Sequence, residues 1–161
     1  MEQIKSFSRD HSYITPGLYL QETKRNINIY DLRFVKPNSS MFIPIPAIHT
    51  IEHLFATWLK TESDIKEQVV SFNPGGCQTM FYLEMFNDKE INVEKEIINC
   101  IDWCLKQNTV PGATKKECGN YKSHNLQCAK LWLREYKRTL NLKRITKNIN
   151  ATLSLLPWKR H

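Results

Sequence analysis

Two histidines and a glutamate lie close together in one short stretch of the chain. His49, Glu52 and His53 are spaced as H-x-x-E-H. On a helix, residues four apart lie on the same face, so both imidazoles can bind one cation while Glu52 leans toward the same edge. The alternative is a histidine pair on a helix with apolar neighbours and no metal. We favour the metal site because the pattern encloses a glutamate and is flanked by apolar helix positions.

A metal centre at these histidines needs a third ligand, for which the candidates are the cysteines and His124. Cys118 can take this role, because the following Gly119 lets the loop turn sharply and the thiolate can then point toward a neighbouring site. Two histidines and one cysteine leave the fourth tetrahedral position open to water or substrate, as in catalytic zinc sites. The alternative for Cys118 is an ordinary loop cysteine.

Cys77 is a second candidate for chemistry. It follows Gly75 and Gly76 in a tight turn between two predicted strands, where its sulfur can be exposed. A reactive thiol and a packed turn cysteine both fit this position. Beside a dication or Arg33 the thiol would ionise and could then carry protons. The remaining cysteines are expected to fill the core rather than to bind a second metal ion; they are Cys100, Cys104 and Cys128.

Alternating and apolar segments predict the elements that position these residues. Four strands are expected, at residues 17–22, 28–36, 69–72 and 79–86. Three helices are expected, at residues 47–61, 93–106 and 123–140. The first helix should begin after Pro44 and Pro46, because proline does not fit inside a helix. The order predicts a single α+β domain, with helices packed on one face of an antiparallel sheet.

Composition favours one folded domain in a reducing compartment. The chain has 161 residues, of which 41% are hydrophobic and 24% charged. Its cysteines are odd in number, and a chain of this size needs no disulfides to hold its core. The N-terminus has no apolar run of signal-peptide length, and prolines and polar side chains interrupt the most apolar stretch, 41–59. We therefore expect a cytoplasmic protein with no membrane span.

The net positive charge is confined to the C-terminal end. All 16 acidic residues precede Lys137, and seven of the 23 basic residues lie from Lys137 onward. Residues 1–136 are thus neutral overall. We expect residues 137–161 to form a solvated, partly disordered basic extension, in preference to a weak contact surface for nucleic acid or an anionic membrane. No nucleic-acid partner is expected.

Five short motifs together resemble the S-ribosylhomocysteine lyase (LuxS) family, in order and in approximate spacing. The resemblance covers about residues 4–136. It predicts a LuxS-like, metallohydrolase-like α+β lyase domain at residues 1–136, followed by the basic extension at 137–161. The motifs are S-F with D-H (6–7, 10–11), Y-D-L-R-F with P-N (30–34, 37–38), H-T-I-E-H-L (49–54), G-C-Q-T (76–79) and C-G-N (118–120).

This resemblance implies a metal-dependent enzyme that cleaves the thioether of S-ribosylhomocysteine. The products would be homocysteine and a dihydroxy-pentanedione, the precursor of autoinducer-2. A carbonyl would migrate along the ribose chain, and β-elimination would then expel the thiol. Each enolisation needs a Lewis acid at the enolate oxygen and a base for the proton. The resemblance also implies a homodimer with active sites at the interface and one divalent metal per subunit, Fe(II) in the cell and Zn or Co in preparations.

The resemblance further implies a role for each residue at the centre. His49, His53 and Cys118 would hold the metal. Cys77, as the thiolate, and Glu52 would be the acid–base pair.

Substrate binding is implied for Ser6, His11 and Arg33. Ser6 and His11 would contact hydroxyl groups, and Arg33 would also lie beside Cys77 and stabilise its anion. The segment before Cys77 departs from the family pattern Asp-Ile-Ser-Pro-Met-Gly-Cys. Ser71 stands where the family has an aspartate that touches the substrate. A hydroxyl can still form hydrogen bonds with a sugar, so Ser71 is kept as a substrate-binding residue.

Two other functions stay open. In a metallopeptidase, for which H-x-x-E-H is the inverzincin order, Glu52 would activate water for peptide hydrolysis and Cys77 would have no role. In a metal-binding relative without turnover, the centre would load with metal but no thiol would be released from the substrate. Ser71 is the feature that points to this third possibility.

Overall fold

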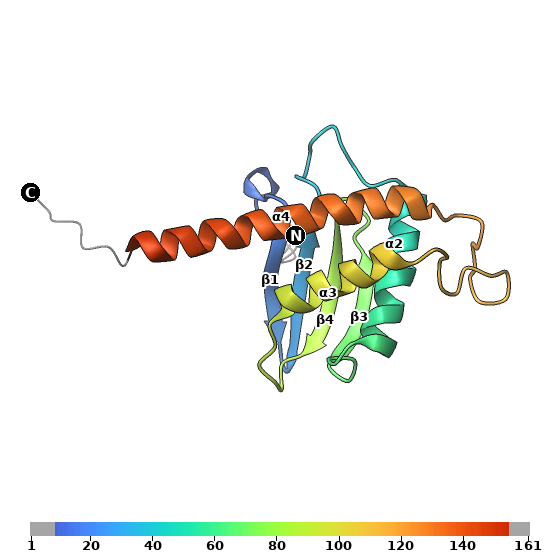
Figure 1. The fold of residues 1–161 in the computed structure, drawn as a ribbon, viewed down its shortest axis with the longest axis horizontal. Helices are drawn as coiled ribbons and strands as arrows, with labels where there is room; N and C mark the ends of the chain where they lie inside the picture. Colours follow the sequence, from blue (N-terminus) through green and yellow to red (C-terminus); the bar gives the residue numbers. More distant parts are fainter. Residues whose placement is uncertain (1–8, 155–161) are drawn as a thin grey trace, which may run out of the picture.

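The computed structural model describes residues 9–154, so Ser6 lies outside the described part of the chain. A four-stranded antiparallel sheet has the order β1-β2-β4-β3 (Figure 1). Its strands are β1 (Gly17–Lys24), β2 (Ile27–Arg33), β3 (Val69–Pro74) and β4 (Met80–Phe86). The four predicted strands are confirmed, with ends that differ by a few residues.

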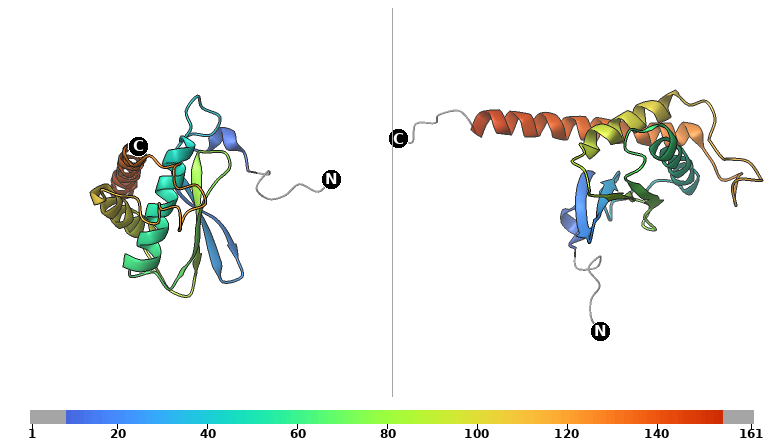
Figure 2. Two further views of the ribbon diagram at one scale, coloured as in Figure 1. Left: turned by 90° about the vertical axis from the view of Figure 1, so that its right-hand side faces the viewer. Right: turned by 90° about the horizontal axis from the view of Figure 1, so that it is seen from below.

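Three α-helices cover one face of this sheet, and the other face carries none of them (Figure 2). They are α2 (Ile45–Thr57), α3 (Val93–Lys106) and α4 (Leu126–Ser154). A short 3-10 helix, η1 (His11–Tyr13), precedes β1, and a π-helical turn, η2 (Trp58–Glu62), continues α2. The predicted α+β class, with helices on one face of an antiparallel sheet, is confirmed.

The core lies between the sheet and the helices. Strand residues alternate between the two faces, so Leu32, Phe81 and Leu83 point toward the helices and are fully buried. From the other side, Ile51 and Leu54 of α2 are buried in the same cluster. This packing fixes the face of α2 that points inward, and the remaining face is free to carry polar side chains.

Helix α2 begins earlier than the sequence predicted. Pro46 lies in its first turn, and Pro44 is the N-cap residue. A proline is tolerated there because the first backbone N–H groups of a helix have no partner within the helix. The carbonyl of Pro44 accepts from Ala47 N and Ile48 N at 2.9 and 3.0 Å. The prediction that both prolines lie before the helix is therefore wrong for Pro46.

Helix α4 begins later and ends later than predicted. It is one helix of 29 residues with no break at residue 136. Tyr136 and Leu140 are buried in the core, and Lys143 Nζ donates to Tyr19 Oη at 2.7 Å, which holds this part of the helix against β1. The expectation of partial disorder is wrong for residues 137–154. Among the residues that the structure describes, no helix is both long and apolar enough to cross a bilayer.

Candidate metal centre and thiol site

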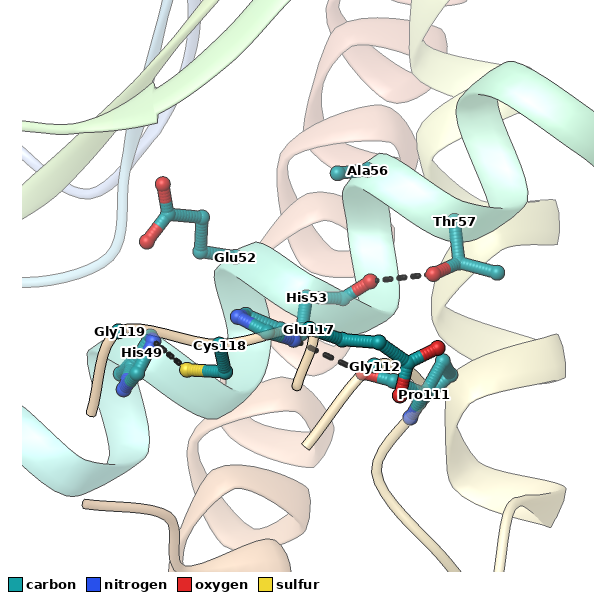
Figure 3. Close-up of a pocket in the computed structure, with 10 residues that line it drawn as sticks. All are labelled: His49, Glu52, His53, Ala56, Thr57, Pro111, Gly112, Glu117, Cys118 and Gly119. Atoms are coloured by element: carbon teal, nitrogen blue, oxygen red, sulfur yellow. Dashed lines mark hydrogen bonds between the residues drawn. The ribbon is translucent and has the colours of Figure 1, made fainter. Parts of the chain in front are cut away.

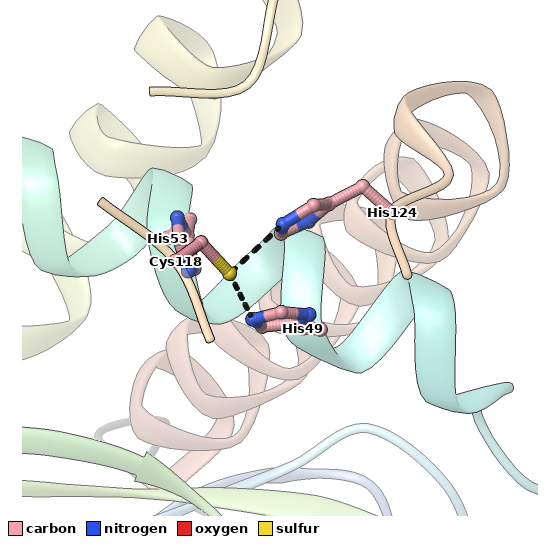
Figure 4. Close-up of side chains that lie close together, drawn as sticks. All are labelled: His49, His53, Cys118 and His124. Atoms are coloured by element: carbon pink, nitrogen blue, oxygen red, sulfur yellow. Dashed lines mark hydrogen bonds between the residues drawn. The ribbon is translucent and has the colours of Figure 1, made fainter. Parts of the chain in front are cut away.

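Four side chains with metal-ligating atoms converge beside α2. His49 and His53 lie one turn apart on α2, Cys118 lies in the loop that joins α3 to α4, and His124 lies just before α4 (Figure 4). One ligand atom from each lies within 4.8 Å of those of the others. The structure thus brings together the three residues predicted as ligands and adds His124, which the sequence left as an alternative third ligand.

Hydrogen bonds to backbone carbonyls orient the two α2 histidines. His49 Nδ1 donates to Ser123 O at 2.9 Å, and His53 Nδ1 donates to Pro111 O at 2.8 Å. A carbonyl can only accept, so each Nδ1 carries a proton, and Nε2 is the ring nitrogen left to bind a metal. His49 Nε2 lies 3.4 Å from Cys118 Sγ.

The donor set fits a divalent transition metal. Imidazole nitrogen and thiolate sulfur are ligands that zinc and iron(II) accept, and carbonyl bonds to the second ring nitrogen are typical of histidines that bind metals. Gly112 has a φ of 65°, and a Cβ there would lie 3.5 Å from His53 Nδ1. A glycine therefore lets the loop pass close to the His53 ring at a backbone conformation that other residues rarely adopt.

His124 is neutral near pH 7 in the protein without metal. Burial, and then the charges of His49 and His53, lower its pKa from 6.5 to about 4. Its ring stacks on that of His49, with 4.0 Å between the ring centroids.

A pocket opens beside these side chains and is lined by both α2 and the α3–α4 loop (Figure 3). Glu52, between the two α2 histidines in the sequence, is among its lining residues. Glu117, Gly112 and Thr57 line it as well. A carboxylate of α2 therefore borders the same pocket as the candidate ligands, where it can exchange protons with a bound molecule.

A second polar cluster surrounds Cys77, which is exposed. Arg33 Nη1 lies 3.9 Å from Cys77 Sγ and donates to Thr79 Oγ1 at 2.7 Å, while the sulfur and the Thr79 hydroxyl are 3.0 Å apart. On its other side, Arg33 Nη2 forms an ion pair of 2.7 Å with Asp31, which is fully buried. Arg9 pairs with the same Asp31 oxygen at 2.8 Å.

The sequence did not assign Asp31 or Thr79 to a site. The sequence signal for Asp31 was its position two residues before Arg33, because residues two apart on a strand share a face. Thr79 is two residues after Cys77 but sits just before β4, where spacing alone fixes no face.

The Cys77 cluster lies outside the pocket beside the candidate ligands. Cys77 and Arg33 are not among the residues that line the pocket beside the candidate ligands. Of the predicted substrate-binding residues, His11 donates through Nδ1 to Arg9 O at 2.8 Å. Ser71 donates to Glu84 Oε2 at 2.9 Å.

The sheet, its three covering helices and the histidine–cysteine group define a metal-binding α+β protein. The family model for S-ribosylhomocysteinase (LuxS) matches residues 4–147. The chain belongs to this family.

Several relatives carry the name S-ribosylhomocysteine lyase. The chain is 39% identical over 150 residues to that of Borreliella burgdorferi strain ZS7, covering 88% of this chain and 94% of the relative. It is 40% identical over 150 residues to that of Borreliella afzelii, with the same shares covered. It is 34% identical over 166 residues to that of Enterococcus faecalis, covering 99% of each chain.

Proposed function

We propose that this protein cleaves the thioether of S-ribosylhomocysteine, releasing homocysteine and a dihydroxy-pentanedione, the autoinducer-2 precursor. The observation that carries the proposal is the convergence of His49, His53 and Cys118 in a chain that belongs to the S-ribosylhomocysteinase family. The atoms of the two products add up to those of the substrate, so the reaction consumes neither water nor an oxidant.

The chemistry consists of proton transfers followed by one bond cleavage. A carbonyl moves along the ribose chain by enolisation until a proton beside it lies β to the sulfur. Removal of that proton then expels the thiol, and the electron pair of the broken C–S bond leaves with sulfur. A divalent ion held by His49, His53 and Cys118 would supply the Lewis acid that stabilises enolate oxygen. We propose Fe(II) in the cell, with Zn or Co able to take its place.

Glu52 and Cys77 are the proposed proton carriers. Glu52 borders the pocket beside the candidate ligands. The guanidinium of Arg33 lies 3.9 Å from the Cys77 sulfur, so a positively charged group borders the proposed base. The Thr79 hydroxyl, 3.0 Å from the same sulfur, provides a hydrogen-bond partner that keeps it oriented.

We also propose that Ser6, His11, Arg33 and Ser71 bind the substrate. Ser71 is supported by its place on β3, the strand that leads to the Cys77 turn. Its hydroxyl lies 2.9 Å from the Glu84 carboxylate, so this part of the sheet still presents a negative charge.

A homodimer with active sites at its interface would join the two clusters. Cys77 and Arg33 lie outside the pocket that Glu52 and the candidate ligands line, which is the arrangement expected if one subunit completes the site of the other. Size-exclusion chromatography with light scattering tests this, and a monomer with full activity would contradict it. We propose that the protein acts in the cytoplasm.

The decisive experiment is thiol release from S-ribosylhomocysteine by the metal-loaded protein, measured with a thiol reagent. We expect release by the wild type and by Cys128→Ala, a matched cysteine control away from the Cys77 cluster, and none by Cys77→Ala. If the fully metal-loaded wild type released no thiol, the proposed activity would be wrong. Ser71→Asp would then show whether the carboxylate missing from that position is the cause.

A further inference from the structure

We propose that the C-terminal part of α4 binds the surface of an anionic membrane, with the helix lying in the plane of the lipid headgroups. We call residues 141–154 the outer segment of α4. The proposed lyase chemistry makes no use of it. The match to the family model ends at residue 147, so the last part of this helix also lies outside that match.

The outer segment projects beyond the sheet and the other two helices (Figures 1 and 2). Within the described part of the chain, the last side-chain hydrogen bond that joins α4 to the rest of the domain comes from Lys143. Its Nζ donates to Thr15 Oγ1 at 3.1 Å and to Tyr19 Oη at 2.7 Å. Every side chain at residues 144–152 is exposed. The outer segment is therefore accessible to a partner along its length.

Three large apolar side chains line one side of the outer segment. They are Leu142, Ile145 and Ile149, whose spacing of three and four residues places them on one face of a helix. Their exposed fractions are 55%, 53% and 53%. Exposed apolar side chains that gather on one face, rather than lying scattered singly, mark an interaction surface.

The opposite side of the outer segment is basic. At about 100° per residue, both isoleucines lie within about 60° of Leu142 around the helix axis. The cations Lys143, Arg144 and Lys147 lie roughly 100–200° from it. No acidic residue follows Glu135 in the sequence, and neither Arg144 nor Lys147 forms an ion pair with another residue in 9–154. The segment thus combines an apolar face with a positive charge that no nearby acid offsets.

An anionic bilayer is the partner that uses both faces. The apolar side chains of such a helix enter the boundary between headgroups and acyl chains, and long cationic side chains reach the headgroup phosphates. Nucleic acid would bind the cations but leave the apolar face in water. A second copy of the same segment would cover the apolar face but bring like charges together. Charge and apolar pattern together therefore favour the bilayer.

The residue types that follow the outer segment fit the same partner. Residues 155–161 read L-L-P-W-K-R-H, with two leucines, a tryptophan and two cations. Tryptophan is enriched where membrane meets water, and leucine and cations are typical of helices that lie in that interface. This support comes from residue type alone.

The test is cosedimentation of the metal-loaded full chain with lipid vesicles. One set contains phosphatidylcholine alone, and the other contains phosphatidylcholine and phosphatidylglycerol in equal parts. We expect binding to the anionic set that weakens as salt is raised, and little binding to the neutral set. Binding to neither set, or equal binding to both, would overturn the proposal. Tighter binding to a mixed-sequence DNA duplex than to the anionic vesicles at the same salt would overturn it too.

Two double variants separate the apolar and the basic contributions. Ile145→Ser with Ile149→Ser should weaken vesicle binding about 25-fold or more, because burying each half-exposed isoleucine is worth about fivefold in affinity or more. Arg144→Gln with Lys147→Gln should also weaken it about 25-fold, since each cation near an anionic surface is worth about fivefold. If the isoleucine pair bound vesicles as the wild type does, the contact would be simple charge attraction and the proposal would be wrong.

Matched controls lie outside α4. Ile45→Ser removes another exposed isoleucine, and Lys24→Gln with Lys89→Gln removes two exposed cations; both should bind vesicles like the wild type. The urea midpoints of the α4 variants should stay near that of the wild type, because the changed side chains are exposed. A lower mass of the isoleucine pair in light scattering would assign the apolar face to a second copy and overturn the proposal. No arm of the test needs S-ribosylhomocysteine, so the result is independent of the proposed lyase activity.

Discussion

Asp31 carries the negative charge of a buried ionic cluster that positions Arg33 beside Cys77. Its side chain is fully buried, and that of Arg33 is 4% exposed. One carboxylate oxygen, Oδ2, pairs with Arg33 at 2.7 Å and with Arg9 at 2.8 Å. Replacing Asp31 with alanine would leave the Arg33 guanidinium buried with no counter-charge among residues 9–154. We therefore expect Asp31→Ala to destabilise the protein strongly.

The size of the effect follows from burial. Breaking a buried ion pair by removing one partner costs about 3–5 kcal/mol, because the remaining charge stays desolvated. The pair with Arg9, whose side chain is 30% exposed, adds about 1 kcal/mol at most. Arg33 keeps its hydrogen bond to Thr79, and its Nε already has no partner within the described residues. With a urea m-value of about 2 kcal/mol per molar, a loss of about 4 kcal/mol lowers the unfolding midpoint by about 2 M.

Urea unfolding followed by circular dichroism measures this, with all variants loaded with the same metal. Asp102→Ala is the matched control, because Asp102 forms an ion pair with Lys137 but is 45% exposed, and its loss should cost under about 1 kcal/mol. The double variant Asp31→Ala with Arg33→Met should recover much of the stability, since no buried charge remains. If Asp31→Ala cost no more than Asp102→Ala, the cluster would be solvated and the reasoning would be refuted.

Three further outcomes are expected. Tyr136→Phe should lower the free energy of unfolding by about 1 kcal/mol, since the buried hydroxyl donates to Gly17 O at 3.0 Å; an unchanged urea midpoint would contradict this. Leu54→Ala should lower the free energy of unfolding by about 2–5 kcal/mol in the same assay, because it opens a cavity in the core. A loss below about 1 kcal/mol would contradict this and would mean that neighbouring side chains fill the cavity. Removing the metal with a chelator should increase amide exchange in residues 108–125, which carry Cys118 and His124, but not in β4; uniform exchange would mean that the metal holds the whole fold.

Local sequence patterns predicted those elements whose structure depends on residues close together in the sequence. The helix expected at residues 93–106 has those bounds in α3, because its apolar positions repeat at helical spacing and Asn92 caps its first turn through a bond to Lys95 N of 3.1 Å. The pair His49 and His53 was likewise readable, since four-residue spacing on a helix places both side chains on one face whatever packs around it.

Such local patterns could not predict contacts between segments that are far apart in the sequence. Beyond residue 140, where the prediction ended, α4 contacts β1 through Lys143, whose Nζ donates to Tyr19 Oη at 2.7 Å from a position 124 residues later in the sequence. The choice between Cys118 and His124 as third ligand also could not be made from spacing. Both residues lie beside His49 because hydrogen bonds join the α3–α4 loop to α2. These contacts are seen in the structure, and they show that both side chains reach the site.

Ser71 shows how strand register changes the interpretation of a substitution. In the sequence, this position lacks the carboxylate that the family pattern carries, which points to weaker substrate binding. In the sheet, Ser71 pairs with Glu84 of β4, and the serine hydroxyl donates to the glutamate at 2.9 Å. Asn73 donates to the same hydroxyl, also at 2.9 Å, so the three side chains form one polar chain. A carboxylate is therefore present one strand away, and the face that leads to Cys77 keeps an acidic group despite the serine.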